Sequence, residues 1–104
     1  MWEVDVQPPR GVPGAVRRAA RVDAVQSEIV KALRSVGGKV LHLHQVGGGC
    51  PDLLVWGRGR TFLVEVKSPG EQINKLQAEF IAAWPGEIHV VNSPEQAVKA
   101  LVGG

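Results

Sequence analysis

Two carboxylates and an ammonium group lie close together in the middle of the chain, at Asp52, Glu65 and Lys67. Two carboxylates that approach each other repel, so a folded protein retains them only if a cation bridges them or one of them is protonated. Oxygen ligands favour a hard divalent ion such as Mg²⁺ or Mn²⁺, which keeps several water molecules when bound. The residue types therefore predict a metal site, provided that the fold brings the side chains together.

Two predicted strands supply that fold, Leu53 to Trp56 and Thr61 to Val66, joined by a glycine-bearing turn over 57–60. In a hairpin centred between Arg58 and Gly59, Asp52 and Glu65 lie equally far from the centre and so face each other. Facing residues have Cβ atoms about 4.5 to 5.5 Å apart. Side chains alternate along a strand, so Lys67 shares the face of Glu65. The hairpin is expected to gather all three groups at one place.

A metal held there can activate water and neutralise charge on a phosphodiester undergoing attack. Lys67 would orient the water or stabilise the developing negative charge. In the alternative interpretation, Asp52 caps the turn after Pro51, and Glu65 and Lys67 form an exposed ion pair. So short a pattern arises easily by chance. However, the run 62–67 is apolar enough to form a central strand, where bare charges are costly without a function. This context favours the catalytic interpretation.

The remaining elements follow from the spacing of apolar residues and from glycine and proline breaks. A helical repeat is stopped by Gly37-Gly38, and Ser93 and Pro94 open a last helix in which Gln96 can complete a capping box. The predicted elements outside the hairpin are a helix from about Ala15 or Arg21 to Val36, a strand from Lys39 to Val46, a helix from about Gln72 to Trp84, a strand from Ile88 to Val91 and a helix from Ser93 to about Val102.

The helix over 72–84 carries one apolar face, formed by Ile73, Leu76, Phe80 and Trp84. The whole order, αβββαβα, predicts an α/β sandwich in which helices flank a central mixed sheet. A length of 104 residues corresponds to one domain. Residues 1–14 are rich in proline and glycine and are expected to form a flexible arm, which leaves 15–104 as the domain.

The composition and the N-terminal sequence indicate the cellular compartment of the protein. No apolar run approaches the roughly 20 residues that span a bilayer, and the N-terminus lacks the pattern of a signal peptide. We therefore expect a cytoplasmic protein without a membrane partner. The single cysteine, Cys50, excludes an internal disulfide and a multi-cysteine zinc site. We interpret it as a small packing residue, and we expect His42 and His44 to lie on a solvated or DNA-facing strand, because no third zinc ligand accompanies them.

The net charge of +2 is unevenly distributed, with seven basic and two acidic side chains in residues 10–39. Phosphate neutralisation by lysine and arginine dominates affinity for nucleic acid, so this segment favours a DNA-facing surface. A solvated basic helix explains the charge alone equally well. The candidate DNA-binding residues are Arg17, Arg18 and Arg21 on the first helix and Arg58 and Arg60 in the hairpin turn.

The segments Gly49-Cys50-Pro51-Asp52 and Glu65-Val66-Lys67, followed by Gln77, resemble the PD-(D/E)xK nuclease superfamily. They are most similar to its VRR-NUC group, the virus-type replication and repair nucleases, whose pattern is a helical Glu, G-x-P-D, ExK and a later Gln. The resemblance covers about residues 22 to 101. It implies a restriction-endonuclease-like fold with αβββαβ order, which agrees with the order read from periodicity.

The resemblance also implies roles for individual residues. Asp52, Glu65 and the backbone carbonyl of Val66 would be metal ligands, and Lys67 would position water. Glu28 matches the helical Glu, a ligand or a partner of the ligands. Its position at the edge of the apolar stripe permits this, but an ordinary ion pair with Lys31 fits equally well.

Gln77 matches the later Gln of the pattern and falls within the apolar face of its helix. A polar side chain there needs a hydrogen-bond partner, which favours a place in the site over a place on the surface.

The expected activity is therefore Mg²⁺- or Mn²⁺-dependent hydrolysis of DNA by an endonuclease. Resemblance to standalone members of the group further implies a homodimer that acts on branched DNA such as four-way junctions. Two alternatives are a non-catalytic DNA-binding module with the same fold and a restriction-type endonuclease that reads a short sequence. The complete set of Asp52, Glu65, Lys67 and Gln77 speaks against the first. The second would require base-edge contacts, for which the chain has little room.

Overall fold

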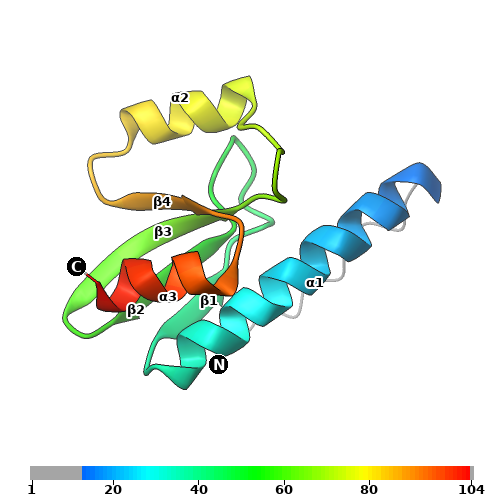
Figure 1. Cartoon of the computed structure of the whole chain (residues 1–104). Helices are drawn as coiled ribbons and strands as arrows, with labels where there is room; N and C mark the ends of the chain where they lie inside the picture. The colour runs from blue at the N-terminus through cyan, green and yellow to red at the C-terminus, as the bar shows by residue number, and fades with distance from the viewer. Residues whose placement is uncertain (1–12, 104) are drawn as a thin grey trace.

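The computed structural model describes residues 13–103, with side chains described from residue 24 onward. Its seven elements have the predicted αβββαβα order (Figure 1). Residues 1–12 of the predicted arm lie outside the described residues, and its last two residues, Pro13 and Gly14, already belong to the first helix. The elements are α1 (Pro13–Ser35), β1 (Lys39–His42), β2 (Leu53–Gly57), β3 (Arg60–Val66), α2 (Lys75–Ala83), β4 (Ile88–Val91) and α3 (Pro94–Val102).

The four strands form one mixed sheet in the order β1-β2-β3-β4. The pairs β1–β2 and β2–β3 are antiparallel, whereas β4 runs parallel to β3. The β2–β3 connection is a two-residue turn in which Arg58 and Gly59 both have positive φ, at 55° and 75°. Such a turn matches the right-handed twist of the flanking strands and fixes the register. The sheet, flanked by helices, confirms the predicted fold class.

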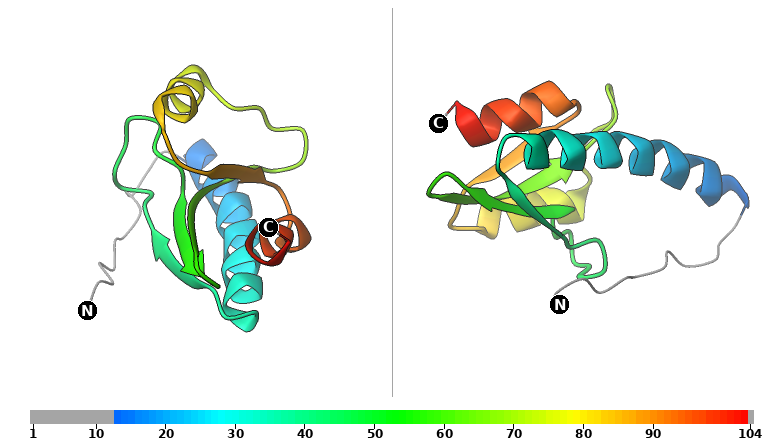
Figure 2. Two further views of the ribbon diagram at one scale, coloured as in Figure 1. Left: turned by 90° about the vertical axis from the view of Figure 1, so that its left-hand side faces the viewer. Right: turned by 90° about the horizontal axis from the view of Figure 1, so that it is seen from below.

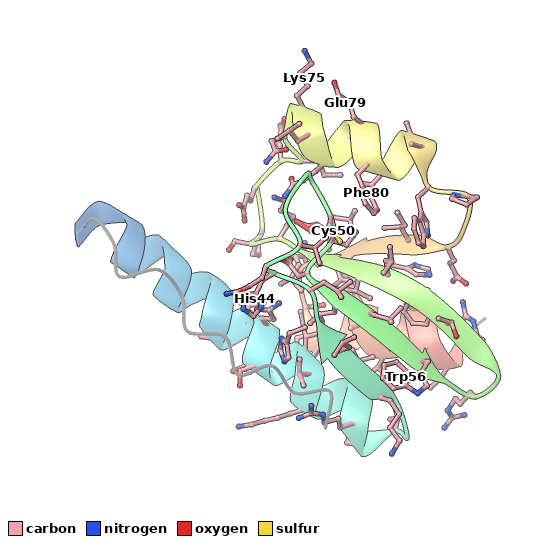
Figure 3. All side chains as sticks on the ribbon, turned by 180° about the vertical axis from the view of Figure 1, so that it is seen from behind. His44, Cys50, Trp56, Lys75, Glu79 and Phe80 are labelled. Carbon is pink, nitrogen blue, oxygen red and sulfur yellow. The ribbon has the colours of Figure 1, made fainter. Side chains whose placement is uncertain are left out.

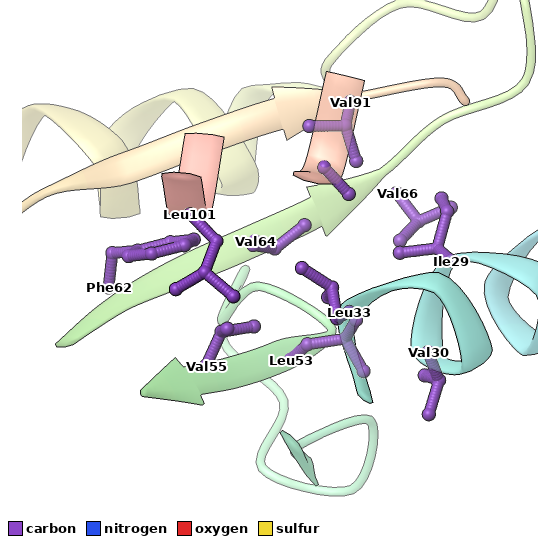
Figure 4. Packing of buried hydrophobic residues seen from close by; sticks show 11 residues of the cluster. Ile29, Val30, Leu33, Leu53, Val55, Phe62, Val64, Val66, Val91 and Leu101 are labelled. Atoms are coloured by element: carbon purple, nitrogen blue, oxygen red, sulfur yellow. The ribbon is translucent and has the colours of Figure 1, made fainter. Parts of the chain in front are cut away.

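The hydrophobic core occupies one face of the sheet, beneath α1 and α3 (Figures 2 and 4). From β3, Phe62, Val64 and Val66 point to this side, while the intervening residues point to the other side, where α2 lies. The helices complete the core with Ile29 and Leu33 of α1 and Ala97 and Leu101 of α3.

The strand β1 is shorter than the predicted strand, ending at His42 rather than Val46. The Leu43 N–H still donates to the Asp52 carbonyl, but the Val46 N–H then donates to the Leu43 carbonyl and closes a turn. Three glycines with positive φ follow, at positions 47, 48 and 49. The chain therefore leaves the sheet as a loop that returns to Asp52.

The helix α2 differs from its prediction in both extent and burial. It begins at Lys75 rather than Gln72, because Asn74 and Gln77 form a reciprocal capping box. It also has no buried residue. The predicted apolar face is wrong for three of its four members: Ile73, Leu76 and Trp84 are exposed, and only Phe80, which stacks on Trp84, is half-buried.

The helix α3 begins as predicted after Ser93, whose side chain accepts a hydrogen bond from the Gln96 N–H. The Gln96 side chain, however, accepts from the Asn92 N–H and not from the N–H of Ser93, so the predicted capping box is displaced by one residue. Among the described residues, no helix combines the length and apolar character needed to cross a bilayer.

The close packing of α3 on the sheet yields a stability prediction. Leu101 is 1% exposed in the core, whereas its neighbour Val102 is 44% exposed. Replacing Leu101 by alanine leaves a cavity and is expected to lower the free energy of unfolding by about 2–5 kcal/mol. Val102→Ala is the matched control and should change it by less than about 0.5 kcal/mol. Equal losses in denaturant titrations of the two variants would contradict this packing.

Candidate active site

The candidate site lies at the end of the β2–β3 hairpin opposite the turn. Asp52 immediately precedes β2, Glu65 is the second-last residue of β3, and Lys67 immediately follows it. The register pairs Leu53 with Val64, so Asp52 and Glu65 face each other as predicted. The Asp52 carboxylate also accepts a hydrogen bond from the Val66 N–H, with 2.8 Å between Oδ2 and N. The start of one strand and the end of the other are thus tied together through the site.

Glu65 is the most deeply buried charged group described, with 3% of its surface exposed. Its Oε1 accepts a hydrogen bond from Gln77 Nε2 at 2.7 Å and lies 3.7 Å from Lys67 Nζ. Its Oε2 is buried and has no hydrogen-bond partner among the described residues. A buried carboxylate oxygen without a partner is costly, which indicates that an additional group belongs beside it.

The electrostatics of the carboxylates point in the same direction. Burial, together with the charge of Asp52, raises the pKa of Glu65 to about 7, although Lys67 opposes the shift. Burial also raises the pKa of Asp52, against the opposing effect of the Val66 N–H. Folding therefore holds both groups where their charged forms are disfavoured. Two destabilised carboxylates and a bare buried oxygen fit a hard divalent cation, which would be held by Asp52 and Glu65.

Lys67 is buried as well, with 8% of its surface exposed, and lies between two carboxylates. Its Nζ is 3.7 Å from Glu65 Oε1 and 3.8 Å from Glu71 Oε2. Its backbone N–H donates to the Val91 carbonyl at 2.8 Å, which fixes the residue at the end of β4. The ammonium group is therefore held beside the carboxylate pair by both backbone and side-chain contacts.

Gln77 reaches the site from α2. The Asn74 N–H donates to Gln77 Oε1, which leaves the amide nitrogen to donate to Glu65. The same capping box that starts α2 thus orients the Gln77 side chain. Asp52, Glu65, Lys67 and Gln77, predicted from separate parts of the sequence, are brought together by the structure.

Glu28 is not brought to this group. It is exposed on α1, and no third Asp, Glu, His or Cys of the described part of the chain joins the pair in a potential metal cluster. The reason is helical phase, because Ile29 and Val30 take the buried side of α1 at this level. Gln26 is buried instead, and its Nε2 lacks a partner among residues whose side chains are described. Its spacing of three residues before Ile29 could have revealed this.

Two of the arginines proposed to bind DNA, Arg58 and Arg60, lie away from the carboxylates. Arg60 donates to the carbonyls of Ala100 and Leu101 at the end of α3 and pairs with Glu87, and Arg58 donates to the Val36 carbonyl. Arg58 in the turn and Arg60 at the start of β3 are separated from the carboxylates by the length of β2, about 16 Å at roughly 3.3 Å per residue. Both arginines therefore have structural partners far from the site. The side chains of Arg17, Arg18 and Arg21 lie outside those described.

Two residues near the carboxylates, His44 and Cys50, were not predicted from the sequence to take part in the site. His44 is exposed but close enough for its charge to oppose the raised pKa of Asp52. Cys50 lies in the loop that leads to β2 (Figure 3). Burial, followed by the charges of Glu65 and Asp52, raises the pKa of its thiol. A thiol kept protonated is a poor nucleophile, which agrees with its interpretation as a packing residue.

The raised pKa of Glu65 predicts how the metal-free protein responds to pH. Folding raises this pKa from its usual 4.5 to about 7, so the native state binds the extra proton in that window. The resulting stability is complete below pH 4.5 and is lost as the pH rises to about 7. The loss is at most about 3 kcal/mol, at about 1.4 kcal/mol per pKa unit. In Glu65→Gln the melting temperature should lose this dependence, whereas exposed Glu95→Gln should retain it. An identical pH slope in all three proteins would disprove the assignment.

Comparisons with known proteins agree with this geometry. The family model of the VRR-NUC domain matches residues 8–93. A solved structure described as a VRR_NUC domain is 28% identical in sequence and superposes with a TM-score of 0.61 over 75% of this chain and 90% of that one. No curated protein matches the chain. The matched segment contains Asp52, Glu65, Lys67 and Gln77. The chain therefore belongs to the VRR-NUC family of nuclease-type, DNA-processing domains.

Proposed function

We propose that this chain is a metal-dependent endodeoxyribonuclease that hydrolyses phosphodiester bonds, with Mg²⁺ or Mn²⁺ held at Asp52 and Glu65. The observation that carries this proposal is the buried Glu65 Oε2, which has no partner among the described residues while Asp52 lies opposite. When bound, a divalent cation there lowers the pKa of water and neutralises charge on the phosphate. The backbone carbonyl of Val66 is a further proposed ligand.

Each of the chain's own residues has a distinct part in the proposal. Asp52 and Glu65 supply the negative charge that attracts the cation, and the Val66 N–H keeps the Asp52 carboxylate in place. Gln77 holds one oxygen of Glu65, so that its other oxygen stays directed to the site. Lys67 places a positive charge 3.7 Å from Glu65, where it can orient the attacking water or stabilise charge that develops on phosphate oxygens.

The proposed substrate is branched DNA such as a four-way junction, cut by a homodimer. The described part of the chain carries a single such site, and two copies would be needed to cut two strands. Arg17, Arg18 and Arg21 lie on the first half of α1, which extends beyond the sheet in Figure 1. We propose that this basic segment contacts the phosphate backbone, which positions DNA without reading its sequence. For Glu28, exposed on the same helix, we propose the role of a partner of the ligands.

The proposal predicts the behaviour of two isosteric variants, Asp52→Asn and Glu65→Gln. Each should lower cleavage by roughly 100-fold or more, because even partners of metal ligands contribute 10- to 100-fold. The measurement is nicking and cleavage of linear duplex, single-stranded, flap and four-way DNA with Mg²⁺, Mn²⁺ or chelator. Exposed Glu79→Gln on α2 is the matched control and should cleave normally. Near-normal cleavage by either site variant, or equal cleavage with chelator, would refute the proposed centre.

A second prediction separates Lys67 from a simple phosphate contact. If the ammonium group acts in the transition state, Lys67→Met should lower kcat by roughly 10²- to 10³-fold and leave KM for DNA nearly unchanged. Initial rates measured over a titration of DNA at saturating Mg²⁺ give the two parameters separately. A rise in KM with kcat preserved would assign Lys67 to substrate binding instead.

A further inference from the structure

Exposed aliphatic side chains lie on the segments that border the candidate site. Val46 is 65% exposed and Leu76 is 57% exposed, and Ile73 is exposed as well. Leu76 directly precedes Gln77, whose amide donates to Glu65, and Val46 lies in the loop that leads to Asp52. Single exposed aliphatic residues need no explanation, whereas aliphatic residues gathered on one surface mark an interaction site. We call Val46, Ile73 and Leu76 the apolar rim.

The loop and the helix that carry the rim are in direct contact. At Gly49, a Cβ atom would lie 2.3 Å from the Leu76 carbonyl oxygen, so the loop backbone packs against the first turn of α2. At Gly47 and Gly48, by contrast, no atom lies within 4 Å of such a Cβ position. Figures 1 and 3 both show the loop rising to the start of α2. The loop and α2 thus form one surface, and the loop has open space beside it at Gly47 and Gly48.

One exposed cation, Lys75, borders the rim, and the exposed Glu79 lies one helical turn further along α2. Lys75 is exposed on the first turn of α2, and that turn contains no acidic residue. The N-terminus of a helix carries a partial positive charge that favours anions such as phosphate. A single surface therefore offers a cation beside aliphatic side chains. This combination complements a nucleic acid strand, which presents phosphates and the apolar faces of its bases.

In a continuous duplex those faces are stacked on each other and are not available. Aliphatic side chains contact them where bases are unpaired or where the side chains wedge between base steps. We propose that the apolar rim contacts unpaired nucleobases next to the cleaved phosphate, and thereby selects DNA with unpaired or distorted bases over continuous duplex. This inference rests on the proposed nuclease function and adds the element that chooses its substrate.

Two polar variants test the rim without disturbing the fold. Val46→Thr preserves shape, and Leu76→Gln preserves helix propensity. Val102→Gln, at an exposed aliphatic position on α3, is the control. The substrates are a continuous duplex and the same duplex with a short run of unpaired bases, compared by kcat/KM. The preference for unpaired DNA should fall about tenfold in Leu76→Gln, the effect of burying much of one aliphatic side chain, and should be unchanged in Val102→Gln.

A binding measurement keeps this test separate from the proposed function. With 2-aminopurine among the unpaired bases and chelator present, binding of the unmodified protein should change the fluorescence, and both rim variants should weaken the change. If no DNA is cleaved but this response persists, the nuclease proposal fails and the rim stands. If cleavage occurs and neither rim variant alters the preference or the fluorescence, the rim proposal is overturned. It is also overturned if sedimentation shows that the variants change only the oligomeric state, which would assign the rim to a second copy of the chain.

Discussion

The register of the β2–β3 hairpin is the constraint on which the rest of the structure depends. It is fixed by a two-residue turn and places alternate residues of β3 on opposite faces of the sheet. Val64 and Val66 enter the core, while Glu65 meets Asp52 on the other face. A shift by one residue would exchange the two faces and bury the charges among apolar side chains. The packing of α1 and α3 therefore also enforces the approach of the carboxylates, although the described side chains of these helices make none of the contacts given above for the pair.

The approach of the carboxylates is only partly compensated by the protein. Gln77, Lys67 and the Val66 N–H each stabilise charge at the site, yet the pKa values of Asp52 and Glu65 remain raised. The repulsion that remains between the two carboxylates destabilises the folded protein. The same concentration of negative charge attracts a cation. More complete compensation by the protein would stabilise the fold and weaken binding. Raised carboxylate pKa values of this kind cluster at functional sites.

Sequence reasoning succeeded where a feature is determined by local chemistry. The hairpin, β4 and the start of α3 depend on turn residues, alternation and a serine cap, all visible within a few positions. It failed where contacts between residues far apart in the sequence determine the structure. The end of β1 depends on a turn at Val46, and Arg60 is engaged by carbonyls of α3 some 40 residues away. The burial of Gln26 and the exposure of Glu28, by contrast, follow from their helical spacing relative to Ile29 and are visible in the sequence. In α2 the apolar residues recur at helical spacing, but the helix buries none of them.

Because α2 buries no residue, the candidate site has one part that is held firmly by the core and one part that is not. Asp52 and Glu65 lie on a hairpin held by the core, and they keep their relation as long as the domain is folded. Gln77 lies on a helix that buries no residue; its described attachments include one hydrogen bond to Glu65 and the contact of Gly49 with Leu76. Elements with little apolar burial open locally at low free energy, and ligand-binding segments are commonly of this kind. Substrate that contacts α2 and the glycine loop would therefore order these segments against a fixed carboxylate pair. We accordingly expect the hairpin to govern chemistry at the site, and the loop and α2 to govern which DNA reaches it.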